Sequence, residues 1–206
     1  MNTVAYGWKD SGPTCAHGYI LPKLLSLIPP DARRVVDLGC GSGFLAGQLA
    51  ARGLQVIGVE RSEDGIAHAR AGHPGIRFEQ ASVDTDLSRV LGGGFDVVIS
   101  TEVIEHLTFP RNLLRNGLSL LRPGGLMLIT TPYHGYLKNL ALSVAGGWDR
   151  HFTADWDGGH IKFFSPRTLR RMTLECGFET VAFAYVGRMP WLWKSMIAIA
   201  WKPSRS

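Results

Sequence analysis

Short β-rich runs alternate with longer helical patterns from Arg34 onward, and this alternation limits the fold more than any other feature of the chain. The runs RVVDLG, LQVIGVE, FDVVIST and GLMLITTP are almost continuously apolar, as strands are when helices cover both faces of a sheet. Alternating strands and helices form βαβ units, and these build parallel sheets. We therefore expect an α/β fold with a doubly wound sheet.

The chain departs from this alternation after the run GLMLITTP and before Arg34. Residues 133–164 are irregular, and an irregular segment of this length in a small domain is usually a lid or a binding loop. The pair Ser165 and Pro166 then starts a helix, with Ser as its cap and Pro in its first turn. The runs FETVAFAYV and KSMIAIAWK predict a hairpin that closes the sheet, and residues 18–28 predict a short helix before the first strand.

The composition is that of one ordered domain. Of 206 residues, 45% are hydrophobic and 19% charged, so we expect a single domain over 1–206 with an insertion at 133–164. Lys and Arg outnumber Asp and Glu by 22 to 17, but they are scattered, which argues against a nucleic acid partner. Three distant cysteines, no signal peptide pattern and no long apolar run favour a cytoplasmic location. The oligomeric state is left open.

The stretch VVDLGCGSGF joins a strand to a glycine turn, which lets a ligand approach the backbone closely. Its GSGFLA part also matches a form of the dinucleotide fingerprint, so an oxidoreductase is one alternative. Asp37 argues against that alternative, because a carboxylate at this strand end would repel a pyrophosphate, whereas it favours a ligand with an amino group and a sulfonium. Glu60, at the end of the next strand, can accept hydrogen bonds from ribose hydroxyls in either case.

Three motifs in order carry a family resemblance: VVDLGCGSG followed by Glu60, then FDVVISTEVIEH, then LRPGGLMLITTP. Together they resemble the successive motifs of Rossmann-like methyltransferases that depend on S-adenosylmethionine (SAM), over about residues 34–202. The pattern is most similar to the ubiquinone-biosynthesis O-methyltransferases, which carry a comparable insertion. The resemblance implies a seven-stranded, mostly parallel sheet with an antiparallel last strand and a lid insertion after the fifth strand.

The resemblance also implies which residues bind SAM and its product S-adenosylhomocysteine. Asp37 and the motif glycines would serve the methionine end of the cofactor, Glu60 its ribose, and Arg61 would flank the adenine. The full expected set is Asp37, Gly39, Cys40, Gly41, Gly43, Glu60, Arg61, Ser82, Val83, Ser100 and Thr101.

Four members of this set belong to the third and fourth strand ends. Ser82 stands where many relatives place an Asp for the adenine amino group, so we expect its hydroxyl and the Val83 backbone to contact that edge. Ser100 and Thr101 would lie beneath the transferred methyl group. These four roles follow from the resemblance alone.

The motif EVIEH places Glu102, Glu105 and His106 on one face if the segment is a helical turn. Two carboxylates and an imidazole on one side invite a divalent cation such as Mg²⁺. The pattern is similar to ubiquinone O-methyltransferases and to small-RNA 2′-O-methyltransferases, in which it is associated with a metal. This resemblance implies Glu102, Glu105, His106 and His160 as ligands, but similar motifs also occur in relatives that use no metal.

Methyl transfer to a hydroxyl requires removal of its proton, while the sulfonium leaving group is neutral and needs no acid. We expect His106, His160 or His134 to act as the base, because imidazole titrates near neutral pH. A bound metal would instead lower the pKa of the hydroxyl.

The insertion bears on the acceptor, because it is mostly apolar with Lys138 nearby, and Trp191, Trp193 and Trp201 add aromatic surface. We interpret it as a lid, or as an amphipathic contact with a membrane surface for a lipid-like acceptor. We therefore predict an O-methyltransferase acting on a small hydrophobic or phenolic metabolite. The alternatives are N- or C-methylation, methylation of an RNA ribose 2′-hydroxyl, and a non-catalytic SAM-binding partner protein.

Overall fold

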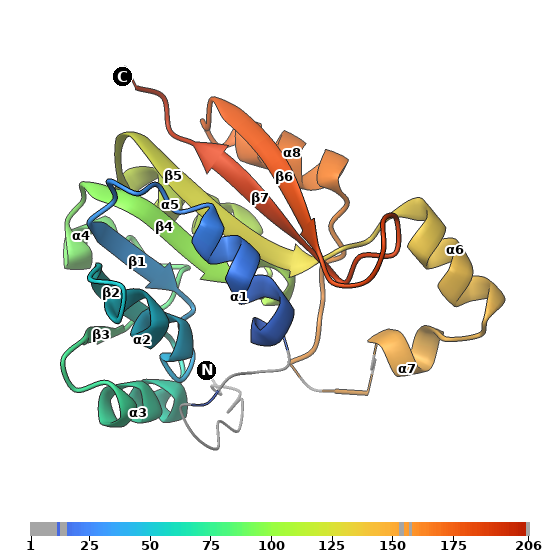
Figure 1. Cartoon of the computed structure of the whole chain (residues 1–206), viewed down its shortest axis with the longest axis horizontal. Helices are drawn as coiled ribbons and strands as arrows, with labels where there is room; N and C mark the ends of the chain where they lie inside the picture. Colours follow the sequence, from blue (N-terminus) through green and yellow to red (C-terminus); the bar gives the residue numbers. More distant parts are fainter. Residues whose placement is uncertain (1–11, 13–15, 153–154, 157, 205–206) are drawn as a thin grey trace.

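The computed structural model describes residues 12, 16–152, 155–156 and 158–204, and within them the chain forms one seven-stranded sheet in the order β3-β2-β1-β4-β5-β7-β6 (Figure 1). The strands are β1 (Arg34–Leu38), β2 (Gln55–Glu60), β3 (Arg77–Gln80), β4 (Phe95–Thr101), β5 (Leu121–Pro132), β6 (Thr180–Val186) and β7 (Ser195–Trp201). The helices are α1 (His17–Ser26), α2 (Phe44–Ala50), α3 (Glu63–Gly72), α4 (Ser88–Leu91), the 3₁₀ turn η1 (Ile104–His106), α5 (Pro110–Leu120), α6 (Tyr136–Val144), α7 (Trp148–Phe152) and α8 (Pro166–Glu175).

The direction of the strands agrees with the expected topology. Neighbouring strands from β3 to β5 pair in parallel, whereas β7 pairs antiparallel with both β5 and β6. The last two runs therefore form the predicted hairpin, and its second strand inserts between β5 and β6. The predicted α/β sheet with an antiparallel last strand is confirmed.

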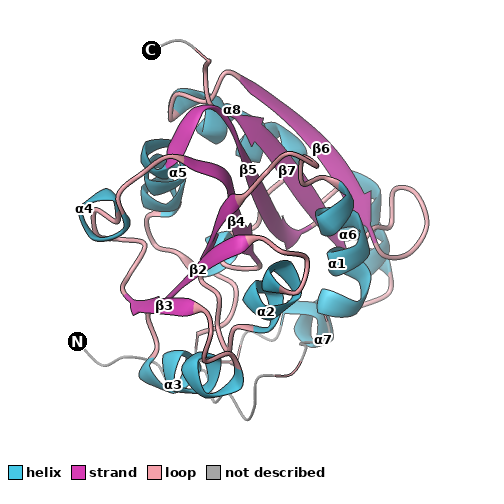
Figure 2. Cartoon of the chain, turned by 60° about the vertical axis from the view of Figure 1, so that its left-hand side comes forward, coloured by secondary structure: helices cyan, strands magenta, loops and turns pink. Residues whose placement is uncertain are grey.

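Helices cover both faces of the sheet, which explains why its strands are apolar throughout. Val35 of β1 faces α1 and α2, and the next residue, Val36, faces α5 and α8. The parallel register of β1 with β4 pairs Val35 with Val97 and Val36 with Val98. Residues on one face of β1 therefore lie beside residues on the same face of β4. Figure 2 shows α4 and α5 on the opposite side of the strands from α1 and α2.

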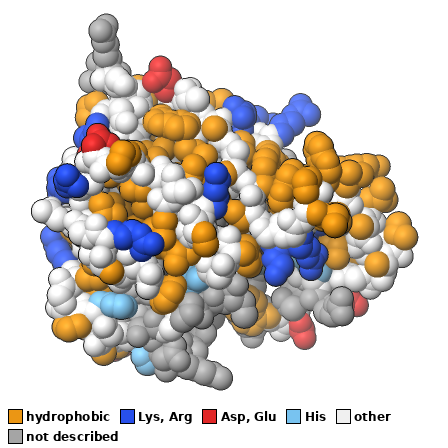
Figure 3. All heavy atoms as spheres, in the orientation of Figure 1, with side chains coloured by type: hydrophobic (Ala, Val, Ile, Leu, Met, Phe, Trp, Pro, Cys, Tyr) orange, Lys and Arg blue, Asp and Glu red, His pale blue; other side chains and the backbone are white. Residues whose placement is uncertain are grey.

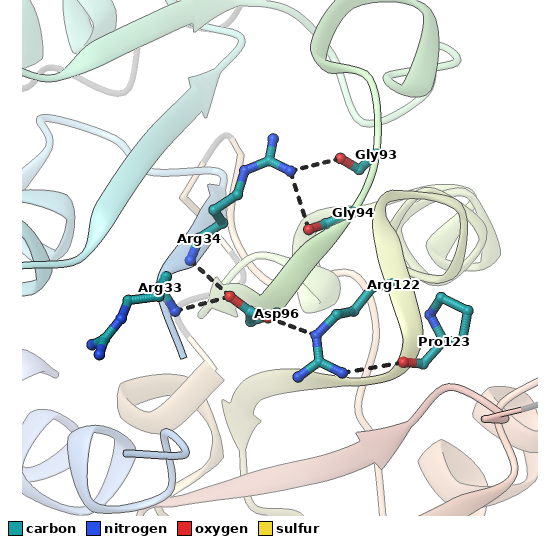
Figure 4. Close-up of polar contacts among 7 residues, drawn as sticks. All are labelled: Arg33, Arg34, Gly93, Gly94, Asp96, Arg122 and Pro123. Atoms are coloured by element: carbon teal, nitrogen blue, oxygen red, sulfur yellow. Dashed lines mark hydrogen bonds and ion pairs between the residues drawn. The ribbon is translucent and has the colours of Figure 1, made fainter. Parts of the chain in front are cut away.

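A single carboxylate joins the beginnings of three adjacent strands (Figure 4). Asp96 accepts hydrogen bonds from the backbone N–H groups of Arg33 and Arg34, at 2.8 and 2.9 Å. Its other oxygen accepts from the Arg122 guanidinium at 2.6 Å. Burial alone would raise the pKa of Asp96, but these donors lower it to about 2. Asp96 therefore connects β1, β4 and β5 at the end of the sheet opposite the glycine turn.

The insertion predicted at 133–164 contains two helices rather than irregular chain alone. Helices α6 and α7 contact each other and lie beyond the tips of β5 and β6 (Figure 1). Lys138 is buried in α6, while the apolar side chains Tyr136 and Val144 are 79% and 82% exposed. The described part of the chain contains no helix that is both long and apolar enough to cross a bilayer.

Candidate active site

The turn after β1 is built from glycines that adopt left-handed backbone angles. Gly39, Gly41 and Gly43 have φ of 80°, 52° and 83°, a region that other residues rarely adopt. A Cβ on Gly39 would lie 2.4 Å from a methyl carbon of Val103. The N–H of Gly39 donates to the Val59 carbonyl of β2 at 2.8 Å. The turn is therefore held between the ends of β2 and β4, and only glycine fits it without strain.

Asp37 lies at the base of this turn with 1% of its surface exposed. Neither carboxylate oxygen has a hydrogen-bond partner in the described residues. Burial, and then the nearby Glu60 carboxylate, raise the pKa of Asp37 to about 7. A buried carboxylate without partners is costly, and the cationic amino group of SAM would compensate it. Asp37 therefore fits the role expected from the sequence.

Glu60 at the end of β2 faces the same turn. Its carboxylate accepts hydrogen bonds from the N–H groups of Gly41, at 3.1 Å, and Ser62, at 2.7 Å. Two bonds leave further lone pairs on its oxygens for ribose hydroxyls. Cys40 is buried beside both carboxylates, and burial together with their charges raises the pKa of its thiol. Arg61 is exposed next to Glu60.

The residues expected at the adenine follow β3, and those expected at the methyl group end β4. The Ser82 hydroxyl accepts from the N–H of Asp84 at 3.1 Å, and the carbonyl of Val83 accepts from the Asn116 amide at 2.8 Å. The Val83 side chain is part of the core. The hydroxyl of Ser82 and the N–H of Val83 stay predictions for the adenine contact.

Ser100 and Thr101 differ in what their hydroxyls do. Ser100 is fully buried, and its hydroxyl donates to the Leu38 carbonyl at 2.9 Å, which links β4 to β1. The hydroxyl of Thr101 is buried without a hydrogen-bond partner in the described part of the chain. The predicted place of both side chains beneath the methyl group stays a prediction.

The EVIEH segment forms a helical turn in its second half only. The turn η1 begins at Ile104, so Glu102 stands before it, with a left-handed φ of 52°. The carboxylate of Glu102 instead accepts from the Thr130 hydroxyl at 2.8 Å. The helical turn expected over Glu102, Glu105 and His106 therefore includes only the last two, while the charge of Glu102 still raises the pKa of Glu105.

Three of the four predicted metal ligands do come together. One ligand atom each from Glu105, His106 and His160 lies within 4.8 Å of the others, and the two imidazole rings are 4.8 Å apart. The Glu105 carbonyl accepts from the N–H groups of Ile161 and Lys162, at 2.9 and 3.0 Å. These backbone bonds place His160 beside η1, although it lies far along the sequence.

The state of each group in this cluster suits a cation. Glu105 is fully buried and its carboxylate oxygens have no hydrogen bond of good geometry in the described residues. Burial, and then the charge of Glu102, raise the pKa of Glu105 well above its usual value, and a bound cation would stabilise its ionised form. The Gly158 carbonyl can only accept a hydrogen bond, so His106 Nδ1 donates to it at 2.8 Å and Nε2 keeps its lone pair. Burial, and then His106, lower the pKa of His160 to about 4, so both imidazoles are neutral at pH 7. A carboxylate and two neutral imidazoles are ligands for a divalent metal.

A cavity of about 310 Å³ lies next to this cluster. Glu102, His134 and His160 line it, so it contains three of the residues singled out in the sequence. His134 packs against the rings of Phe152 and Phe163, at 5.7 and 5.2 Å, and burial, then Lys138, lower its pKa to about 4. The remaining lining residues are Tyr19, Pro132, Lys138, His151, Phe152, Arg188, Lys194 and Ser195.

Sequence reasoning missed several lining residues. Tyr19 of α1 and Ser195 of β7 approach each other with hydroxyl oxygens 3.4 Å apart, although they belong to opposite ends of the chain. Arg188 belongs to the turn between β6 and β7. No local pattern marks such residues, and the turn GRMP was the one signal available.

Comparisons with known proteins agree with this geometry. The family model described as a methyltransferase domain matches residues 16–182. The chain belongs to the SAM-dependent methyltransferases. The methyltransferase is 32% identical over 155 residues to the ubiquinone biosynthesis O-methyltransferase of Ruegeria pomeroyi, an alignment that covers 72% of this chain and 60% of the relative. The corresponding protein of Parvibaculum lavamentivorans is 34% identical over 135 residues, covering 62% and 53%.

Solved structures confirm the fold of this methyltransferase. A SAM-dependent methyltransferase from Archaeoglobus fulgidus superposes with a TM-score of 0.68 at 18% identity, covering 89% of this chain and 91% of the other. Magnesium protoporphyrin IX methyltransferase from Synechocystis, solved with S-adenosylhomocysteine, gives 0.65 at 20% identity, covering 89% and 80%. The predicted family, fold and SAM cofactor are therefore confirmed. The chain spans about 60% of the length of the first curated relative.

Proposed function

We propose that this methyltransferase transfers the methyl group of SAM to a hydroxyl of a small phenolic acceptor bound in the 310 Å³ cavity. The observation that carries the proposal is the cluster of Glu105, His106 and His160 at the edge of this cavity. A phenolic hydroxyl must lose its proton as its oxygen attacks the methyl carbon and the carbon–sulfur bond breaks. Neutral imidazoles at this place are suited to take that proton.

SAM supplies the electrophilic methyl group, and the residues of the chain position it and the acceptor. The Asp37 carboxylate would accept from the amino group of the cofactor, and the backbone of the glycine turn allows close approach. Glu60 would bind the ribose hydroxyls. Holding the sulfonium and the acceptor oxygen in line lowers the barrier chiefly by orientation.

We further propose that Glu105, His106 and His160 hold a divalent cation such as Mg²⁺. The Gly158 carbonyl keeps the His106 proton on Nδ1, so the neutral ring would bind a cation through Nε2. A cation bound there lowers the pKa of an acceptor hydroxyl. Without a cation, His160 or His106 serves as the base, and His134 borders the same cavity.

We also propose a peripheral contact of α6 with a membrane surface. Tyr136, Leu137, Leu140 and Val144 form an exposed apolar face on this helix, and Figure 3 shows hydrophobic side chains gathered over that part of the molecule with Lys and Arg beside them. An apolar helical face next to cations is suited to an anionic lipid surface. Binding to vesicles that contain an anionic lipid should disappear in the double variant Leu137→Asp and Leu140→Asp, and persist in Leu174→Asp, an equally exposed leucine on α8. A wild-type protein that does not bind such vesicles removes this proposal.

Turnover and ligand binding test the proposed reaction. S-adenosylhomocysteine should form with SAM and catechol, and SAM should raise the thermal unfolding temperature. Amine and carbon acceptors or an RNA oligonucleotide, tried in parallel, separate the N-, C- and ribose-methylation alternatives. Binding of SAM without turnover of any acceptor would favour a non-catalytic partner protein. Protection against thermal unfolding by NADH but not by SAM would contradict the proposed methyl transfer. A cytoplasmic location stays a prediction from the cysteines, of which Cys40 and Cys176 are free thiols.

A further inference from the structure

The cavity beside the His–carboxylate cluster is lined by three cations and one carboxylate. The cations are Lys138, Arg188 and Lys194, and the carboxylate is that of Glu102. Throughout the described ranges, none of these cations has a carboxylate within 4.0 Å of it. Glu102 offsets part of this positive charge, and an anionic acceptor would be attracted to the remainder.

Lys138 is the cation whose position most requires a partner. It is 5% exposed, and its ammonium group donates one hydrogen bond, to the Tyr133 carbonyl at 2.8 Å. An ammonium group has three N–H donors, so two remain for other acceptors. Burial, and then the positive charge of Arg188, lower the pKa of Lys138 to about 8, although the Glu102 carboxylate acts in the opposite direction. A buried cation that is repelled by a second cation is stabilised by an anion between them.

The other two cations are presented by the turn between β6 and β7. The Lys194 ammonium group lies 4.9 Å from the centre of the Tyr19 ring, a cation–π contact that keeps it at the cavity. Arg188 has φ of 44°, and of the non-glycine residues described, Glu102, Arg188 and Trp191 have positive φ. Two of these three line the cavity, and such backbone strain concentrates at functional sites.

Lys138 and Arg188 also act on the imidazoles that line the cavity. Lys138 and Arg188 contribute, after burial, to a lowered pKa of His151, and Lys138 contributes in the same way at His134 and His160. Glu102 lies among these cations, because Ser195, the neighbour of Lys194, donates to its carboxylate at 3.5 Å and the Glu102 charge acts on Lys138. The lining still holds more positive than negative groups, and an anion would balance them.

We propose that the methyl acceptor is a hydroxylated aromatic carboxylic acid, whose carboxylate binds Arg188, Lys194 and Lys138. Its ring would lie among Tyr19, His134 and Phe152, and its hydroxyl would face the Glu105–His106–His160 cluster. This inference rests on the proposed function and makes the acceptor class narrower than a hydrophobic or phenolic metabolite. A carboxylate is planar and accepts two N–H groups from one guanidinium, so Arg188 can bind it in a bidentate manner.

Three acceptors that share two vicinal hydroxyls test the charge preference: 3,4-dihydroxybenzoate, catechol and 3,4-dihydroxybenzylamine. The wild-type enzyme should have a kcat/KM for the benzoate at least about tenfold above that for catechol, as expected for a charge-assisted hydrogen bond, and the amine should be the poorest. Arg188→Gln and Lys194→Gln should each lower kcat/KM for the benzoate about tenfold and change that for catechol less than about twofold. Arg188→Lys should retain part of the preference because it keeps the charge.

Matched exposed cations provide the controls. Arg167→Gln and Lys23→Gln, in α8 and α1, remove the same charges away from the cavity and should change neither rate. Equal use of the benzoate and catechol, or a preference that survives Arg188→Gln combined with Lys194→Gln, would overturn the inference. Tighter binding of phenyl phosphate than of benzoate would also overturn it, in favour of a phosphorylated acceptor.

Calorimetry separates failure of this inference from failure of the proposed function. If SAM binds but no acceptor is methylated, the proposed function fails, and the anion site is then judged by binding alone. Titration of 3,4-dihydroxybenzoate into the protein loaded with S-adenosylhomocysteine should give saturable heat that Arg188→Gln weakens about tenfold. Absence of that binding in the wild-type protein would overturn the inference whatever the activity.

Discussion

His106 Nδ1 donates a hydrogen bond of 2.8 Å to the carbonyl oxygen of Gly158, a residue 52 positions further along the chain. This bond settles the tautomer of His106 and fastens the segment that carries His160 onto η1. A backbone carbonyl that orients an imidazole in this way is a common feature around metal ligands. The same bond would also orient Nε2 as a general base, so chemistry at the cluster depends on it in either case.

Removal of divalent cations tests the metal proposal. Treatment with a chelator should lower methyl transfer to catechol by about tenfold or more, and Mg²⁺ or Mn²⁺ should restore it. Glu105→Gln should weaken Mn²⁺ binding, measured by electron paramagnetic resonance, while Glu179→Gln, an exposed control, should not. Full activity after chelation would discard the metal and leave the histidines as the base.

Asp37→Asn should have opposite effects on stability and on SAM binding. The pKa of Asp37 rises from 3.8 to about 7 on folding, so ionised Asp37 disfavours the folded state. This cost is absent below about pH 4, grows as the pH rises to about 7, and is complete above it. At pH 8 the Asn variant should therefore have a free energy of unfolding higher by up to about 4 kcal/mol, with little difference at pH 4.

The same substitution removes the partner of the cofactor's amino group. SAM affinity of the Asn variant, measured by calorimetry at pH 8, should fall about tenfold or more. Asp31→Asn, at an exposed site, is the matched control for both measurements. A variant that gains no stability between pH 4 and pH 8 relative to the wild-type protein would contradict the strained, functional role of Asp37.

Much of this architecture follows from local patterns in the sequence. The strand runs and their order predict the sheet because continuous apolar strands need helices on both faces, as Val35 and Val36 show. The position of Glu102 was not predictable, because one left-handed residue broke the helical spacing of EVIEH. Tyr19 and Arg188 meet at the cavity through the sheet order, which no local spacing records.

Asp96 should make an acid-sensitive contribution to stability. Its folded pKa of about 2 lies below the ordinary value of 3.8, so its hydrogen bonds stabilise the fold above about pH 4 and are lost as the pH falls toward 2. Asp96→Ala should lower the free energy of unfolding at pH 7 by about 2 kcal/mol, measured by urea denaturation. Asp31→Ala should leave it nearly unchanged. An Asp96 variant as stable as the wild-type protein at pH 7 would show that the Arg33, Arg34 and Arg122 contacts contribute little.

Two glycines with nearly equal φ allow the cost of backbone strain to be distinguished from the cost of close packing at Gly39 in the cofactor turn. Gly39 has φ of 80° with Val103 where a Cβ would stand, whereas Gly53 has φ of 81° and no atom within 4 Å of that position. Gly53→Ala should therefore cost only the left-handed backbone, about 1–2 kcal/mol, and leave SAM binding unchanged. Gly39→Ala should lower the free energy of unfolding by more than this and should weaken SAM binding. Adding Val103→Ala should return the free energy of unfolding to that of Gly53→Ala. Urea denaturation and calorimetry measure both effects, and equal costs for the two single variants would mean that Val103 yields freely and does not fix the turn.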